Sequence, residues 1–153
     1  MAKHVGVNLP EDLVQYLKTE KAVGVLATFS EKGLPHTTPL QCVYPKGNES
    51  LLITINKNHR GYHNMVWQKK VMISFLGDDN IAYSILGRAG VVRAPSSVHP
   101  MMNVIRVDVI DIKSDRSILC KVNKGVQWEY TSEDAKDLLD TLYQEMRELA
   151  RTL

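Results

Sequence analysis

One stretch of the chain collects basic and imidazole side chains but contains no carboxylate. Residues 50–77 have no Asp or Glu, and their basic and imidazole residues are Lys57, His59, Arg60, His63, Lys69 and Lys70. With the histidines neutral, this stretch has a formal charge of +4, whereas the whole chain has +2 and the other residues therefore −2. Such a local surplus of cations indicates either a solvated basic loop or a binding site for an anion.

The residues around Arg60 favour an anion site, specifically for a phosphate ester. Residues 55–62 lie where a predicted strand gives way to a predicted helix, so free N–H groups at the helix start would lie beside Lys57 and Arg60. An arginine can hold two phosphate oxygens at once. Gly61 leaves room for those oxygens against the backbone. A solvated basic loop remains the alternative.

Other chemistry has little support in the sequence. His59 and His63 are four residues apart, but Arg60 stands where HExxH has Glu and no carboxylate lies nearby, so we expect no metal. Cys42 and Cys120 are far apart and without a CxxC pair, so we interpret both as half-buried strand residues. His36 and His99 are plausible polar groups of a pocket. No catalytic residue is nominated.

The elements that position these residues are mostly strands. Short β-rich runs cover residues 23–29, 36–44, 50–56, 71–76, 81–92 and 103–112. Turn residues separate the early runs at 30–33, 45–48 and 77–80. Most successive runs lack the dozen or more intervening residues that a parallel crossover requires. The pattern predicts a small all-β barrel built from antiparallel hairpins.

Three helices are predicted to flank the barrel, over about residues 10–20, 60–70 and 132–153. The last has an apolar face and a capping pair, Thr131 with Asp134. Residues 94–100 are too rich in Pro and Ser to extend a strand, so we expect a loop there. We expect the acids of the last helix to lie on a solvated outer face; they are Glu133, Asp134, Asp137, Asp140, Glu145 and Glu148.

The composition limits the class of protein. With 153 residues, 44% hydrophobic and 24% charged, the chain is expected to form a single domain over 1–153 that includes the amphipathic helix 132–153. A net charge of +2 argues against a nucleic-acid partner. No apolar run approaches the length of a membrane span, and the N-terminal residues lack a secretory signal pattern. We therefore expect a cytoplasmic protein without a membrane partner.

Four stretches, in their order and spacing, resemble the FMN-binding split barrels related to pyridoxamine 5′-phosphate oxidase. They are residues 8–13 as a first helix, 25–39 as a first hairpin, 52–75 as the phosphate-binding turn with its flanking elements, and 86–92. The resemblance covers about residues 8–95. It implies a mainly β fold, namely a small antiparallel split β-barrel of the Greek-key type with flanking helices.

The resemblance also implies a homodimer that binds two FMN molecules between its subunits. By position, the second strand would flank the ribityl chain and ring, the third would contact the isoalloxazine edge, and the turn after it would hold the phosphate. The cofactor-binding residues expected in this way are Thr38, Pro39, Leu40, Gln41, Thr54, Ile55, Asn56, Lys57, His59, Arg60 and Gly61.

The sequence departs from the family pattern at two places. Gly61 stands where many members have a second Lys, Ser or Thr, so the phosphate would rest more on Arg60 and Lys57. The last residues form an amphipathic helix in place of the segment with Arg and His that binds pyridoxamine phosphate. We therefore expect a flavin-dependent oxidoreductase for another small molecule. The alternatives are a non-catalytic flavin carrier or sensor, or a deazaflavin- or haem-binding relative, with His59, His63 or His99 as axial ligand.

Overall fold

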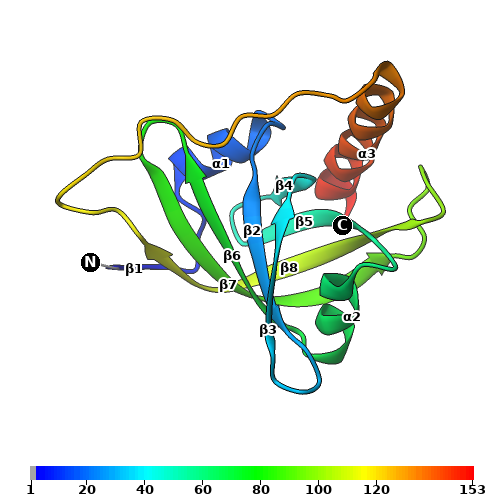
Figure 1. The fold of residues 1–153 in the computed structure, drawn as a ribbon, viewed down its shortest axis with the longest axis horizontal. Coiled ribbons are helices and arrows are strands. Elements are labelled where there is room, and N and C mark those ends of the chain that lie inside the picture. Colours follow the sequence, from blue (N-terminus) through cyan, green and yellow to red (C-terminus); the bar gives the residue numbers. More distant parts are fainter. Residues whose placement is uncertain (1–2) are drawn as a thin grey trace.

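The structure, a computed structural model, describes residues 3–153. Within these residues, three helices accompany the strands (Figure 1). In chain order the elements are β1 (Lys3–Gly6), α1 (Glu11–Lys18), β2 (Gly24–Phe29), β3 (Pro35–Leu40), β4 (Val43–Lys46), β5 (Ser50–Asn56), α2 (Arg60–Trp67), β6 (Lys70–Gly77), β7 (Ile81–Arg93), β8 (Met102–Ser114) and α3 (Glu133–Thr152).

The strands form one antiparallel sheet that curls into a split barrel. Its order is β3-β2-β6-β7-β8-β5-β4, and β1 pairs with β8. Strands β3 and β4 stand at opposite ends of this order, although only Gln41 and Cys42 separate them in the chain. The sheet therefore returns on itself, and β3 lies near β5 without a continuous ladder between them. We call this interruption the split. The expected mainly β split barrel is confirmed.

Two apolar clusters hold the elements in place. Inside the barrel, alternate residues of β2 and β6 such as Leu26, Ile73 and Phe75 pack with Leu13 and Leu17 of α1. Outside the barrel, α3 packs on the outer face of β5 and β8. This second cluster contains Cys42, Leu52, Val104, Leu142, Tyr143, Met146 and Leu149. Because β5 is covered on both faces, all its residues except the last are buried.

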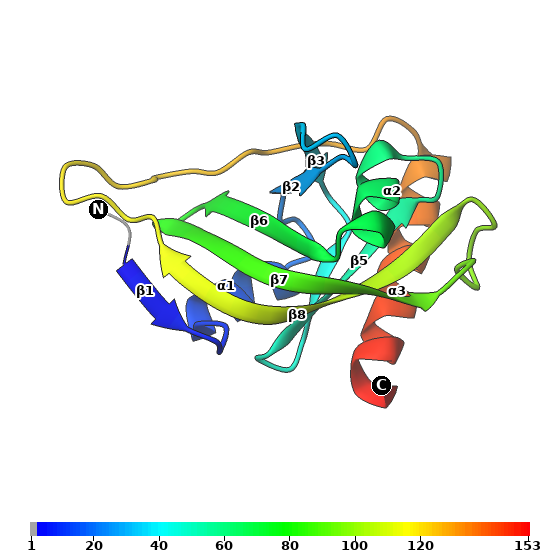
Figure 2. The ribbon, with the colours of Figure 1, turned by 90° about the horizontal axis from the view of Figure 1, so that it is seen from below.

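The helices predicted over residues 10–20, 60–70 and 132–153 are all present with somewhat shorter bounds. Figure 2 shows α3 beside the barrel, joined to β8 by a long irregular segment. The predicted strand 36–44 is divided into β3 and β4, and the loop expected at 94–100 lies between β7 and β8. No helix within residues 3–153 has the length and apolar character required to span a bilayer.

Two local predictions were wrong. The cap of α3 is Ser132 rather than Thr131, since the Ser132 side chain accepts a hydrogen bond from the Ala135 N–H at 3.0 Å. The cysteines are not half-buried strand residues. Cys42 is buried in the short connection between β3 and β4, whereas Cys120 is exposed in the irregular segment before α3.

Candidate functional site

A pocket of about 200 Å³ lies at the split. The ends of β3 and β5 and the residue before α2 supply most of its walls. It brings together eight of the eleven predicted cofactor residues: Thr38, Pro39, Leu40, Gln41, Thr54, Ile55, Asn56 and His59. The lining is completed by four residues that were not predicted to belong to the site, namely Cys42, Met102, Leu139 and Leu142.

The other three predicted residues do not line this pocket. Lys57 and Arg60 are exposed and follow the lining residues Asn56 and His59 in the chain. Neither forms an ion pair with a carboxylate within the described residues. Gly61 is buried, and a Cβ there would lie 3.2 Å from His59 Nδ1 and 3.5 Å from Leu26. Two cations are therefore available for an anion beside the pocket.

His59 joins the start of α2 to β3 across the split. Its Nδ1 accepts a hydrogen bond from the Gly61 N–H at 2.9 Å, which caps the helix. Its Nε2 lies 3.2 Å from Thr38 Oγ1. Because Nδ1 accepts, the neutral ring carries its hydrogen on Nε2 and donates it to Thr38. The Thr38 hydroxyl hydrogen then remains for the Pro39 carbonyl, 3.4 Å away, or for a ligand.

This capping corrects the expectation of free N–H groups at the start of α2. The Gly61 N–H is used by His59 Nδ1, and the Tyr62 N–H donates to the His59 carbonyl at 3.0 Å. An anion beside the pocket would therefore be held mainly by the side chains of Lys57 and Arg60, rather than by the row of amides that was expected.

Two buried polar atoms near the split have no hydrogen-bond partner among the described residues, namely Thr54 Oγ1 and His36 Nδ1. Thr54 is 3% exposed and belongs to the pocket lining. The His36 ring lies 5.8 Å from the His59 ring, edge to face. Buried polar groups are almost always paired in proteins. An unpaired hydroxyl in a pocket wall is thus available to a bound molecule.

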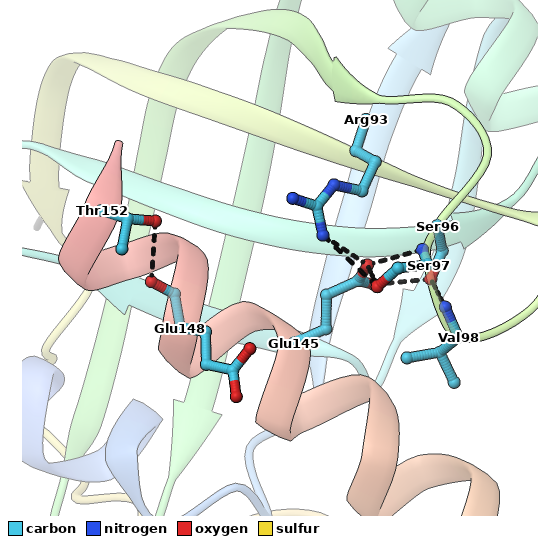
Figure 3. A network of polar contacts seen from close by, with 7 residues as sticks. All are labelled: Arg93, Ser96, Ser97, Val98, Glu145, Glu148 and Thr152. Atoms are coloured by element: carbon cyan, nitrogen blue, oxygen red, sulfur yellow. Dashed lines mark hydrogen bonds and ion pairs between the residues drawn. The ribbon is translucent and has the colours of Figure 1, made fainter.

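The acids of α3 do not all lie on a solvated face. Glu145 is 4% exposed and accepts hydrogen bonds from the loop between β7 and β8 (Figure 3). Its donors are Ser96 Oγ at 2.5 Å, Ser97 N at 2.7 Å, Ser97 Oγ at 2.6 Å and an Arg93 nitrogen at 3.0 Å. Burial alone would raise the pKa of Glu145, but the hydrogen bonds from Ser96, Ser97 and Arg93 outweigh it and lower that pKa.

A larger cavity of about 710 Å³ lies away from the split, between α1, the turn after β6 and residues 125–128. It contains none of the predicted site residues. Two of its carboxylates are already engaged: Asp12 accepts from Tyr83 and Arg116, and Asp78 accepts from the Gly125 N–H. Since the pocket at the split has the unpaired hydroxyl and the nearby free cations, it is the stronger candidate site.

Proteins of known structure share this fold. A pyridoxamine 5′-phosphate oxidase-like protein of Lactobacillus delbrueckii is 20% identical, with a TM-score of 0.61 over 72% of this chain and 98% of that one. An F420 reductase is 19% identical, with a TM-score of 0.57 over 68% of this chain and 98% of that one. The flavin reductase of a styrene monooxygenase from Pseudomonas putida S12 is 8% identical, with a TM-score of 0.51 over 65% of this chain and 87% of that one. At these identities the likeness establishes the fold.

The sequence itself matches a family. No protein of curated function matches the chain. A family model described as pyridoxamine 5′-phosphate oxidase matches residues 9–126, which include β2 to β8 and the whole of α1 and α2 but not α3. The matched part supplies every lining residue of the pocket at the split except Leu139 and Leu142. The chain belongs to the pyridoxamine 5′-phosphate oxidase family, whose split-barrel fold it shares with reductases of flavins and of F420.

Proposed function

We propose that this chain binds FMN at the split and is a flavin-dependent oxidoreductase acting on a small molecule other than pyridoxamine phosphate. The observation that carries the proposal is the pocket, where eight residues expected to contact the flavin lie together although they come from separate elements. Family membership and the fold shared with a flavin reductase support a flavin-type cofactor.

The residues present fit FMN in their chemistry. Lys57 and Arg60 carry unpaired positive charge beside the pocket for the phosphate, and Arg60 can form a two-pronged contact. The hydroxyls of Thr38 and Thr54 are available to the ribityl chain or the ring edge. Leu40, Ile55, Met102, Leu139 and Leu142 supply apolar walls. When bound, the flavin would supply electron or hydride transfer, while the chain binds it, orients it and limits its contact with water.

The size of the pocket supports a site shared between two subunits. About 200 Å³ is below the roughly 300–1,000 Å³ of pockets that enclose a small molecule. One chain would therefore surround only part of FMN. The outer face of β2 and β6 carries Val25, Phe29 and Leu76, each about half exposed, and is the kind of apolar surface that a second copy would cover. We propose a homodimer with FMN at its interface.

A deazaflavin is the second candidate cofactor, because an F420 reductase has the same fold. Haem bound through His59 is disfavoured, since both ring nitrogens of His59 are already engaged, by Gly61 and by Thr38. At His99 only Nδ1 is engaged, by the Met101 N–H at 3.1 Å, so haem bound through His99 or through the exposed His63 stays an alternative. The absorbance spectrum of the purified protein separates these cofactors. Reduction of the bound flavin by NADH or NADPH, followed by stopped flow, separates an enzyme from a carrier.

The phosphate contact provides the decisive test. FMN and riboflavin differ only by the phosphate, so Arg60→Ala should weaken FMN by about tenfold or more, as expected for a charge-assisted hydrogen bond, and leave riboflavin nearly unchanged. Lys69→Ala is the matched control, because it removes an exposed cation from the same carboxylate-free stretch at the far end of α2. Equal losses for both ligands, or a wild-type chain that takes up no FMN, would contradict the proposal.

A further inference from the structure

The helix α3 contacts both sides of the pocket through buried polar side chains. Tyr143 donates its hydroxyl hydrogen to the Gln41 carbonyl, and Glu145 accepts hydrogen bonds from the loop between β7 and β8. We propose that Tyr143 and Glu145 are positioning residues that fix the width of this pocket, one on each side. The inference rests on the proposed function only in taking the pocket at the split as the flavin site.

Tyr143 holds the side of the pocket formed by residues 38–42. Its ring is 2% exposed and packs in the apolar cluster with Cys42 and Leu52, so the hydroxyl has little freedom to move. Its partner is the carbonyl of Gln41, a lining residue at the end of β3. If residues 38–42 moved away from α3, a buried hydroxyl would lose its acceptor, which is costly. Tyr143 thus ties this side of the pocket to α3.

Glu145 holds the side formed by residues 54–56, through a short relay. The carboxylate binds Ser96 and Ser97 (Figure 3). The Ser96 N–H donates to the Met102 carbonyl at 2.7 Å, and the preceding Met101 carbonyl accepts from the Lys57 N–H at 2.8 Å. Met102 lines the pocket and is paired with Asn56 in the ladder of β5 and β8. Glu145 therefore acts on the backbone beside the two cations proposed to bind phosphate.

The geometry of the helix explains how one element reaches both sides. Residues two positions apart are separated by about 200° around an α-helix, so Tyr143 and Glu145 point in nearly opposite directions. Between them in direction, Leu139 and Leu142 form the pocket wall itself. The family match ends at residue 126, so α3 and both positioning residues lie outside the matched part, whereas their partners lie inside it.

A buried carboxylate is a costly way to attach a helix if attachment is the only purpose. An apolar residue of similar volume avoids the desolvation of a charge, whereas a fully hydrogen-bonded carboxylate imposes defined directions on its donors. Glu145 meets four donors, three from Ser96 and Ser97 of the loop and one from Arg93 at the end of β7. This favours a role in which the position of the loop, and not only its attachment, matters.

Amide hydrogen exchange of the ligand-free protein tests the positioning directly. Glu145→Gln keeps the side-chain volume but replaces one acceptor oxygen by a donor. It should speed exchange of the Lys57 and Ser96 amides by at least about tenfold while leaving that of Thr54, whose N–H donates to the Cys42 carbonyl, nearly unchanged. Tyr143→Phe should instead speed exchange of the Thr54 amide and leave exchange of the Lys57 and Ser96 amides nearly unchanged. The controls are Glu148→Gln, whose carboxylate points away from the network in Figure 3, and Tyr44→Phe, a half-buried tyrosine of the same cluster.

Ligand binding gives a second, independent readout. Glu145→Gln should weaken FMN more than riboflavin, because it loosens the backbone beside Lys57, whereas Tyr143→Phe should weaken both ligands equally. Uniformly faster exchange over the whole barrel in both variants, or the same pattern in both, would overturn the inference in favour of plain stabilisation. If the wild-type chain binds no flavin, the proposed function fails, and the exchange pattern still decides whether the two residues position the pocket.

Discussion

Glu145 should make the stability of this protein depend on pH, and its contribution can be separated from that of the other carboxylates by substitution. Replacing it by Ala leaves the buried Ser96 hydroxyl, the Ser97 N–H and the Arg93 guanidinium without their shared acceptor. Loss of hydrogen bonds to a buried charge costs about 2–4 kcal/mol, a large part of the 5–15 kcal/mol that stabilises a typical domain. For a chain of this size that corresponds to a melting temperature lower by about 6–12 °C.

The sign of the pH effect follows from the lowered pKa. Burial opposes ionisation of Glu145, but the hydrogen bonds to its carboxylate prevail. The pKa of Glu145 in the folded state is therefore below its ordinary value of 4.5. The stabilisation is therefore fully present above that value and is lost as the pH falls through the lower pKa of the folded state. Urea unfolding of the wild type and of Glu145→Gln, from neutral pH down to about pH 3, should show a difference in free energy that is largest near neutrality and shrinks below about pH 4.5.

The matched control for this measurement is Glu148→Gln on the same helix. Figure 3 shows the Glu148 carboxylate pointing away from the network, and only its backbone carbonyl is used, by Thr152. This control should change stability by no more than about 0.5 kcal/mol, as for most surface substitutions. A difference between wild type and Glu145→Gln that does not vary with pH would refute the reasoning, as would an equal effect of the control.

Two further predictions concern the barrel and the cysteines. Gly24→Ala should destabilise the fold by about 1–3 kcal/mol in thermal unfolding, because its Cβ would lie 2.7 Å from Phe75 and 3.0 Å from Ile73. Gly90→Ala is the control and should cost far less, because the space around Gly90 is open. Similar losses of stability at both sites would contradict this packing. In the native protein a thiol reagent at neutral pH should modify Cys120 alone, because Cys42 is buried and burial raises its pKa to about 12. Mass spectrometry identifies the modified cysteine. Early modification of Cys42 would contradict this prediction.

The strands and helices were largely predictable from the sequence because their signals are local. Alternation of apolar residues marks β2 and β6, and the apolar stripe of α3 marks a long helix. The order of motifs along residues 8–95 was also enough to name eight residues that come together in one pocket. Each of these inferences depends on residues that are close in the chain or on a spacing that the family shares.

The contacts that depend on distant residues could not be predicted. Glu145 was assigned to a solvated face together with the five other acids of the helix, yet its partners lie 48–52 residues away, at the end of β7 and in the loop that follows it. Of the free amides expected at the start of α2, the Gly61 N–H is taken by the side chain of His59, whose orientation no spacing reveals, and the Tyr62 N–H by the His59 carbonyl. Neither Leu139 nor Leu142 carries any sign, in its own neighbourhood, of the pocket that it lines.

The split is also the place where the fewest backbone hydrogen bonds resist opening of the barrel. Elsewhere neighbouring strands are joined by antiparallel ladders of several residue pairs, so widening the barrel there would break several backbone hydrogen bonds together. Across the split the direct ties are few: Thr54 N–H to the Cys42 carbonyl, and His59 to Thr38. We therefore expect fluctuations of the barrel to be largest along the line where the pocket lies, within the limits that α3 sets, and a molecule bound there to reduce them.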